Sequence, residues 1–306
     1  NGYVNIFSTT GAFAALKADG SITAWGSTYL GGSNAPTGSG YVNVFSNNVA
    51  FAALKSDGSI TAWGDSGSGG SNAPTGTGYV DIFSTQVAFA ALKSDGSITA
   101  WGRSDRGGSG APTGTGYVNI FTNYYAFVAL KSDGSVSVWG DSDYGGSAPN
   151  SVTDTNHELF VPIVNVFSNN YAFAALKSDG SISVWGSNFG GSTTNDTWYT
   201  GAPSSVTNAN SGVVNVFSTN TAFAALKSDG SVTVWGGKGN GGLTGNDSYY
   251  GRGAPSSVTS ANSGVVNIFS TSGAFAALKS DGSITAWGSA DNGGSITNAP
   301  EFNAYR

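Results

Sequence analysis

Short apolar segments recur along this chain in a fixed order, and each set ends in a Trp-Gly pair. In the second set, YVNVFS at Tyr41–Ser46 is followed by VAFAALK at Val49–Lys55 and by ITAWG at Ile60–Gly64. These segments are rich in β-branched and aromatic residues, which favours strands over helices. The middle segment is apolar on both faces, which is typical of a strand buried on both sides. The pattern therefore predicts three antiparallel strands in each repeat.

Polar residues between the segments predict where the chain turns. Two or three turn residues follow Ser46. The Ser-Asp-Gly-Ser stretch at Ser56–Ser59 predicts a hairpin in which Asp57 and Gly58 supply the positive φ angles of a type I′ turn. Because successive strands run in opposite directions, the turn after Ser46 and the Trp-Gly end share one side, named the top face. The Asp-Gly turns lie on the bottom face and barely vary, so variation collects on the top face.

The set of segments occurs seven times, which predicts the fold class. Its tryptophans are spaced by 38, 38, 38, 46, 50 and 52 residues, a period typical of stacked supersecondary units. We predict an all-β, closed seven-bladed β-propeller with mostly three-stranded blades. We expect a single domain over residues 1–306, with repeats starting near residues 3, 41, 79, 117, 163, 213 and 265. In an alternative closure, Tyr3–Ser8 pairs with the blade that contains Trp287.

The residues that recur in every repeat have structural interpretations. We expect the tryptophans to pack between blades, because an aromatic binding pocket is normally singular rather than sevenfold. A Lys and an Asp flank each bottom turn, as Lys55 and Asp57 do in the second repeat, and together they form a near-neutral ring. The seven tryptophans are Trp25, Trp63, Trp101, Trp139, Trp185, Trp235 and Trp287.

The segment ALKSDGSITAWGD at Ala53–Asp65, followed by Gly-Gly and Ala-Pro, resembles the repeat of the regulator-of-chromosome-condensation superfamily of propellers. Its compact form is most similar to bacterial members, including the seven-bladed β-lactamase-inhibitory propeller. Such repeats commonly carry Gly-x-x-His-Ser before the Ala-Leu pair, whereas this chain has stretches such as FSNNVAFAAL. The resemblance implies the propeller fold. Relatives include an exchange factor and an enzyme inhibitor, so it implies protein recognition on a propeller face.

Composition narrows the functional classes. The chain has 12 Lys and Arg against 18 Asp and Glu, a net charge of −6, and no cysteine. Without clustered basic residues we expect no nucleic-acid partner, and without a long apolar run we expect no membrane insertion. Low charge and abundant Thr, Ser, Asn and Gly predict an extracellular or cell-surface bacterial protein. A chain that starts at Asn1 without methionine fits part of a larger chain or assembly.

Signals of catalysis or metal binding are sparse. The chain has one histidine, His157, beside Glu158, and Glu158 is one of two glutamates, which leaves few general acid–base groups. Asp141-x-Asp143 and Asp291-Asn292-Gly293 only partly resemble a calcium loop, and the expected glutamate does not follow either of them. We predict that the protein is not an enzyme and has no cofactor, no catalytic residues and no metal site.

Aromatic residues that break the repeat pattern are the candidate binding residues. They fall in top-face turns or in the long connections of the fourth to sixth repeats, flanked by Asn, Ser and Gly, as on adaptable binding surfaces. We predict a binding module, with protein recognition as the leading function, glycan binding as one alternative and a structural spacer as another. A flat aromatic face favours a protein, and one exposed aromatic side chain with converging polar groups favours a glycan. The candidates are Tyr124, Tyr125, Tyr171, Trp198, Tyr199, Tyr249 and Tyr250.

Overall fold

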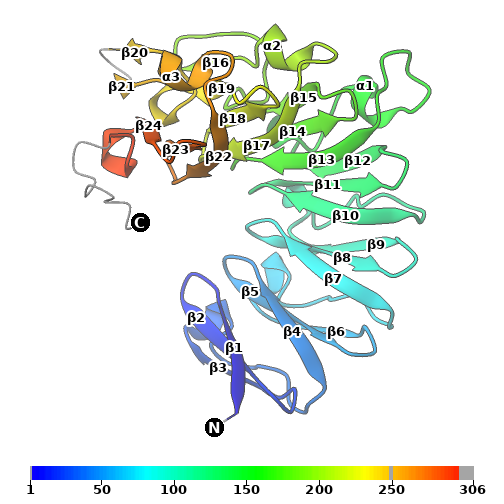
Figure 1. The fold of residues 1–306 in the computed structure, drawn as a ribbon. Coiled ribbons are helices and arrows are strands. Elements are labelled where there is room, and N and C mark those ends of the chain that lie inside the picture. The colour runs from blue at the N-terminus through cyan, green and yellow to red at the C-terminus, as the bar shows by residue number, and fades with distance from the viewer. Residues whose placement is uncertain (1, 248–250, 296–306) are drawn as a thin grey trace. The chain divides into compact units, whose positions relative to one another are not determined.

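The computed structural model describes residues 2–247 and 251–295, and strands dominate it (Figure 1). Within these residues, every repeat forms its own antiparallel sheet, giving seven sheets. Five sheets have three strands, one has four and one has five. The chain divides into two compact units, Asn1–Pro162 and Ile163–Arg306, named unit 1 and unit 2.

Unit 1 contains the first four blades, each with its strands in sequence order across the sheet. A short 3₁₀ turn follows each third strand. The strands are β1 (Tyr3–Ser8), β2 (Ala12–Lys17), β3 (Ile22–Gly26), β4 (Tyr41–Ser46), β5 (Ala50–Lys55), β6 (Ile60–Gly64), β7 (Tyr79–Ser84), β8 (Ala88–Lys93), β9 (Ile98–Gly102), β10 (Tyr117–Thr122), β11 (Ala126–Lys131) and β12 (Val136–Gly140). The 3₁₀ turns are Thr28–Leu30, Ser66–Ser68, Ser104–Arg106 and Ser142–Tyr144, and the helix α1 covers Asn150–Thr153.

Unit 2 contains the remaining three blades, and the long connections add strands to two of them. The strand β16 joins the sixth blade through β19, and β21 and β20 extend the seventh blade beyond β24. The strands are β13 (Ile163–Ser168), β14 (Ala172–Lys177), β15 (Ile182–Gly186), β16 (Tyr199–Thr200), β17 (Val213–Ser218), β18 (Ala222–Lys227), β19 (Val232–Gly237), β20 (Asn246–Asp247), β21 (Gly251–Arg252), β22 (Val265–Ser270), β23 (Ala274–Lys279) and β24 (Ile284–Gly288). The helices are α2 (Ser204–Thr207) and α3 (Ser256–Thr259), and 3₁₀ turns cover Lys238–Asn240 and Ala290–Asn292.

The predicted fold class is confirmed: the chain is all-β, with the seven mostly three-stranded blades of a β-propeller. The first strand of each repeat starts at the position read from the sequence. β1 pairs with β2 of its own blade, with Ile6 opposite Ala15, so blade and repeat coincide and the alternative pairing of Tyr3–Ser8 with the last blade is wrong. The single-domain assignment stays a prediction.

The bottom turns differ from the predicted type I′ geometry. The N–H of Gly58 donates to the carbonyl of Lys55 at 2.9 Å, and the N–H of Lys55 donates to the carbonyl of Ser59 at 2.9 Å. Gly58 has φ +79°, whereas Asp57 is not among the residues with positive φ. The type I′ prediction is therefore wrong. The carboxylate of Asp57 instead accepts hydrogen bonds from Ser59, which stabilises an Asp side chain on its own turn.

These Asp-Ser turns predict an acid dependence of stability. The Ser231 hydroxyl, at 2.6 Å, and the Ser231 N–H, at 2.9 Å, donate to Asp229 and lower the pKa of its carboxyl. A carboxyl with a lowered folded pKa stabilises the fold above its unfolded pKa, and this contribution disappears as the pH falls through the folded value. Hydrogen bonds from the serine two residues later lower the pKa in the same way at Asp19, Asp57, Asp95, Asp133 and Asp281.

We therefore expect Ser231→Ala to lower the melting temperature near neutral pH, and this difference from the wild type to shrink as the pH falls below about 4. Melting curves recorded across the acid range measure it. In an Asp229→Asn background, which removes the titrating group, the effect of Ser231→Ala should not depend on acid pH. A difference that grows as the pH falls would contradict the linkage.

Packing between neighbouring blades forms the core of each unit. Successive residues of a middle strand point to opposite faces, so Ala12, Ala14 and Leu16 of β2 meet the Phe51–Trp63 face of the next blade. The small alanines let the aromatic pair approach closely. The rings of Phe51 and Trp63 stack with their centroids 5.1 Å apart.

Within each unit, a hydrogen bond fixes the indole of a blade on the blade before it. Nε1 of Trp63 donates to the carbonyl of Gly31 at 2.9 Å, Trp101 donates to Gly69, and Trp235 donates to Gly190. These tryptophans are buried, as are Trp139, Trp185 and Trp287. The structural interpretation is confirmed for Trp63, Trp101, Trp139, Trp235 and Trp287, each of which packs on the preceding blade of its own unit. Trp25 and Trp185 belong to the first blades of the two units, so no blade precedes them within their units.

The first residue of the first strand, near the bottom face, packs differently in blades with short and with long connections. In unit 1, Tyr41 packs there and Nζ of Lys55 lies 5.0 Å from the centre of its ring. In the sixth blade a valine, Val213, replaces the tyrosine and packs with Val206 of α2. Each long connection thus supplies its own apolar side chain through a one-turn helix, which leaves the top-face residues available for other roles.

Candidate functional site

Recurring polar side chains position the top-face loops. Nδ2 of Asn47, between β4 and β5, donates to the carbonyl of Ser68 at 2.7 Å, and Asn123 makes the same bond to Tyr144 at 2.6 Å. In the sixth blade, the hydroxyl of Thr219 donates to the carbonyl of Asn240 at 3.1 Å. The turn after the first strand and the loop after the third strand therefore lie on the same side of a blade, which confirms the predicted top face.

Backbone hydrogen bonds also connect the top-face turns of neighbouring blades. In unit 1 the N–H of Asn48 donates to the carbonyl of Gln86, and the N–H of Gln86 donates to the carbonyl of Tyr124. In unit 2 the N–H of Asn170 donates to the carbonyl of Asn220 at 3.2 Å. The variable side chains of these turns are thus held on a hydrogen-bonded backbone.

The candidates in unit 1 belong to a compact aromatic and charged cluster. Tyr125 packs on Tyr144, with ring centroids 4.4 Å apart, and the guanidinium of Arg106 lies 4.4 Å from the centre of the Tyr125 ring. Arg106 also forms an ion pair of 2.7 Å with Asp141, and both of these side chains are largely shielded from solvent. Tyr124 contacts Tyr125 edge-on and is more exposed. Tyr125 is therefore part of the packing, and Tyr124 is the accessible residue.

The candidates in unit 2 form an aromatic row beside a groove. Tyr171 packs on Phe189 with ring centroids 5.2 Å apart, and Phe189 meets Tyr199 edge-on at 4.4 Å. Trp198 is 53% exposed. The groove has a volume of about 360 Å³ and is lined by Phe189, Trp198, Tyr199, Thr221, Gly237, Lys238, Gly239 and Asn240.

Hydrogen bonds hold the loop that carries Trp198. The carboxylate of Asp196 accepts from the N–H groups of Trp198 and Tyr199, at 2.7 and 3.0 Å. β16 pairs with β19 at Tyr199 and Gly237, and the N–H of Lys238 donates to the carbonyl of Trp198 at 3.1 Å. Burial, together with the charge of Asp196, raises the pKa of the Tyr199 hydroxyl, so this tyrosine stays neutral. Trp198 is therefore presented on a fixed loop.

The structure divides the predicted set between the two units. Tyr124 and Tyr125 meet in unit 1, while Tyr171 and Tyr199 meet in unit 2 through Phe189. The predicted residues Tyr249 and Tyr250 lie outside the described residues. Binding at these residues remains a prediction.

Sequence reasoning missed Arg106, Tyr144, Phe189 and Lys238. The first three occupy the end of the loop after Trp-Gly, where other repeats have residues such as Ser68. An aromatic or charged side chain at a position that is Leu30, Ser68, Asn240 or Asn292 in the other repeats was the available signal for them.

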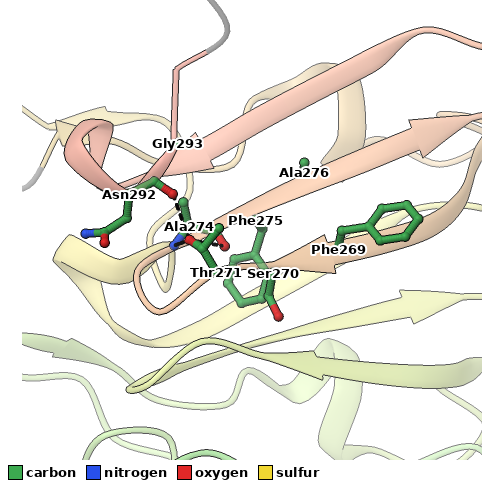
Figure 2. A pocket seen from close by; sticks show the side chains of 8 residues that line it. All are labelled: Phe269, Ser270, Thr271, Ala274, Phe275, Ala276, Asn292 and Gly293. Atoms are coloured by element: carbon green, nitrogen blue, oxygen red, sulfur yellow. Dashed lines mark hydrogen bonds between the residues drawn. The ribbon is translucent and has the colours of Figure 1, made fainter. Parts of the chain in front are cut away.

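A smaller hollow, in the seventh blade, has a structural explanation. It has a volume of about 90 Å³ and is lined by Phe269, Ser270, Thr271, Ala274, Phe275, Ala276, Asn292 and Gly293, with Phe269 directed away from Asn292 and Gly293 (Figure 2). In the sixth blade the equivalent alanines, Ala222 and Ala224, pack against Phe275 and Trp287. The hollow thus lies on the blade-packing face of the last blade of unit 2.

Two of the residues considered for chemistry, Asp141 and His157, have other partners. Asp141 binds Arg106, its carboxylate also accepts from the N–H of Asp143, and Nδ1 of His157 accepts from the N–H of Leu159. Over residues 2–247 and 251–295, no three His, Cys, Asp or Glu side chains are grouped so that they could hold a metal ion. Within the same ranges, no helix has the length and apolar character needed to cross a membrane.

No family model and no curated protein sequence matches the chain. Solved structures that it resembles include the CRINKLY ectodomain of the Arabidopsis thaliana receptor kinase ACR4, with 14% identity over 94% of this chain and 97% of that chain and a TM-score of 0.46. Prp20p of Saccharomyces cerevisiae has 14% identity over 78% and 72% of the two chains, and human WBSCR16 has 16% over 78% and 76%, each with a TM-score of 0.46. Prp20p is yeast RCC1, so the resemblance read from the repeat extends to solved structures. At these TM-scores the likeness carries no argument about function.

Proposed function

We propose that this protein is a non-catalytic binding module that recognises a protein partner through the groove of unit 2. The observation that carries the proposal is Trp198, which is half-exposed at the rim of the groove and held there by the hydrogen bonds of Asp196. Tryptophan and tyrosine dominate the energetics of protein interfaces when they enter a pocket of the partner. A fixed backbone lowers the entropy lost when such a side chain becomes ordered on binding.

The polar groups around the groove favour a protein over a glycan at this position. Nδ2 of Asn240 donates to the hydroxyl of Thr221 at 2.7 Å, and Nζ of Lys238 donates to the carbonyls of Asp196 and Thr197. These groups bond one another and the backbone instead of converging on the open space. The accessible surface beside them is aromatic, as expected for the centre of a protein interface.

The class and location of the module form part of the proposal. The carboxylate of Asp141 is engaged in an ion pair and the imidazole of His157 in a turn, which supports a role without catalysis. The low charge and the abundance of Gly, Ser, Thr and Asn support a bacterial secreted or cell-surface protein.

Trp198→Ala tests the proposal. Partner proteins captured from surface and secreted fractions by the immobilised chain are identified, and their affinities are measured by titration calorimetry. We expect Trp198→Ala to weaken binding by about 2 kcal/mol or more, a factor of about 30, with an unchanged melting temperature. Leu159→Ala, at an exposed apolar residue of unit 1, is the matched control and should bind normally.

Three outcomes would contradict protein recognition at this groove. The first is a partner whose affinity does not depend on Trp198. The second is binding of an oligosaccharide that Trp198→Ala abolishes, which would favour the glycan alternative at this position. The third is concentration-dependent self-association that Trp198→Ala abolishes, which would favour an assembly role.

A further inference from the structure

Unit 1 contains a polar hollow that none of the predicted residues touches. It has a volume of about 390 Å³ and lies between the loop after β3 and the end of β6. Tyr29, Thr28, Ser33 and Asn34 line it from the first repeat, and Asp65 lines it from the second. This volume falls within the range of about 300–1,000 Å³ that is usual for small-molecule sites.

The side chains around this hollow are available to a ligand. Tyr29 is 85% exposed on the 3₁₀ turn at Thr28–Leu30. Among the described residues, the side chains of Thr28, Ser33, Asn34 and Asp65 form no hydrogen bond or ion pair with protein groups. The lining thus includes one aromatic ring, one carboxylate, one amide and the three hydroxyl residues Thr28, Ser33 and Ser66.

The corresponding places in the next repeats are occupied by internal ion pairs. Between the second and third blades the counterparts of Tyr29 and Asp65 are Gly67 and Arg103, and Arg103 binds Asp105 of its own blade at 2.8 Å. Between the third and fourth blades they are Asp105 and Asp141, and Arg106 forms ion pairs with both, at 3.5 and 2.7 Å. A combination of unpaired polar side chains and an exposed ring, at Tyr29 and Asp65, thus occurs only between the first two of these four blades. The third and fourth repeats have the same 3₁₀ turn after their third strands.

The backbone also constrains Asn34. It has φ +60°, a left-handed conformation that asparagine tolerates better than most residues, and the equivalent Asn72 has φ +59°. The third repeat has Gly110 at this position, with φ +78°. The turn therefore accepts glycine, and the amide of Asn34 is not required for the conformation.

We propose that this hollow is a carbohydrate-binding site that holds one neutral sugar residue against Tyr29. The C–H face of a sugar ring packs on an aromatic face, and its hydroxyls both donate and accept hydrogen bonds. The carboxylate of Asp65 accepts from them, while the amide of Asn34 can donate and accept. No Lys or Arg is among the described residues that line the hollow, so the charge of Asp65 disfavours acidic sugars. The site is separate from the aromatic groove of unit 2.

The other repeats provide substitutions that preserve the fold. Tyr29→Gly introduces the residue found at Gly67, Asp65→Ser the residue found at Ser27, and Asn34→Gly the residue found at Gly110. Each change removes one group of the hollow and keeps the local sequence within the range of this chain. Asn72→Gly, one blade further on, is the matched control because it makes the same change outside the hollow.

The experiment screens the full chain on an array of neutral and acidic oligosaccharides and then titrates the best neutral sugar by protein-observed NMR at millimolar concentrations. We expect binding by the wild type and at least about tenfold weaker binding by Tyr29→Gly and Asp65→Ser, a difference of about 1.4 kcal/mol. Asn72→Gly and Trp198→Ala should bind the sugar like the wild type. All of these variants should keep the wild-type melting temperature, and if Tyr29→Gly alone lowers it, Asp65→Ser and Asn34→Gly carry the test.

Three results would overturn the proposal. They are the absence of sugar binding by the wild type at millimolar concentration, sugar binding that survives both Tyr29→Gly and Asp65→Ser, and a requirement of Tyr29 for a protein partner only. If Trp198→Ala did not affect protein binding, the proposed function would be wrong but the sugar site at Tyr29 would not be contradicted. The two proposals can therefore fail independently.

Discussion

Trp63→Ala is expected to lower the free energy of unfolding by about 3–5 kcal/mol. The indole is buried between the first two blades, stacks on Phe51 and donates to the carbonyl of Gly31 at 2.9 Å. Truncation opens a cavity against Ala12 and Ala14 and leaves the Gly31 carbonyl without its indole partner. Urea denaturation followed by circular dichroism measures the change.

Trp198→Ala is the control for this prediction. Trp198 is 53% exposed on the loop that precedes β16, so its removal should cost clearly less than the removal of Trp63. Equal losses at the two sites would show that burial between blades is not what Trp63 contributes.

Gly69→Ala is expected to lower the free energy of unfolding by about 2–5 kcal/mol, because two costs add. Gly69 has φ +97°, which disfavours any residue with a Cβ, and an added Cβ would lie 2.7 Å from the ring of Phe89. The shift needed to relieve this overlap would also disturb the 3.0 Å hydrogen bond from Trp101 to the Gly69 carbonyl. The measurement is the same denaturation experiment.

Gly76→Ala separates the two costs of this substitution. Gly76 lies further along the same connection of unit 1 and has φ +101°, but an added Cβ would meet nothing within 4 Å. Only the backbone cost of about 1–2 kcal/mol should remain there. If Gly76→Ala proved as destabilising as Gly69→Ala, the steric role of Phe89 would be excluded.

The candidate site was only partly readable from the sequence. Non-repeated aromatics did lead to Tyr124 and Trp198, which are exposed, but Tyr125, Tyr171 and Tyr199 proved to be partly packed. Exposure depends on neighbours such as Tyr144 and Phe189, which lie on other loops. Tyr29 could have been found by the same reasoning, because the next repeats have Gly67 and Asp105 in its place.

Local sequence patterns were sufficient to predict the strands, the number of blades and the structural role of the buried tryptophans. The pattern of apolar residues and the turn residues favour strands and hairpins locally, and every repeat has the same apolar faces. A single repeat such as Tyr41–Gly64 therefore contains the information for its blade. The bottom-turn type was missed because hydrogen bonds from Ser59 to Asp57 favour a different local geometry.

The groups that meet between blades could be identified only from the folded chain. The bond from Trp63 to the Gly31 carbonyl joins residues 32 positions apart, and the bond from Asn47 to Ser68 spans 21. The hollow at Tyr29 depends on Asp65 of the next blade, whereas its counterparts Arg103 and Asp141 form ion pairs. Such contacts depend on how blades stack and how each loop satisfies its backbone, and a pattern along one strand does not contain that information.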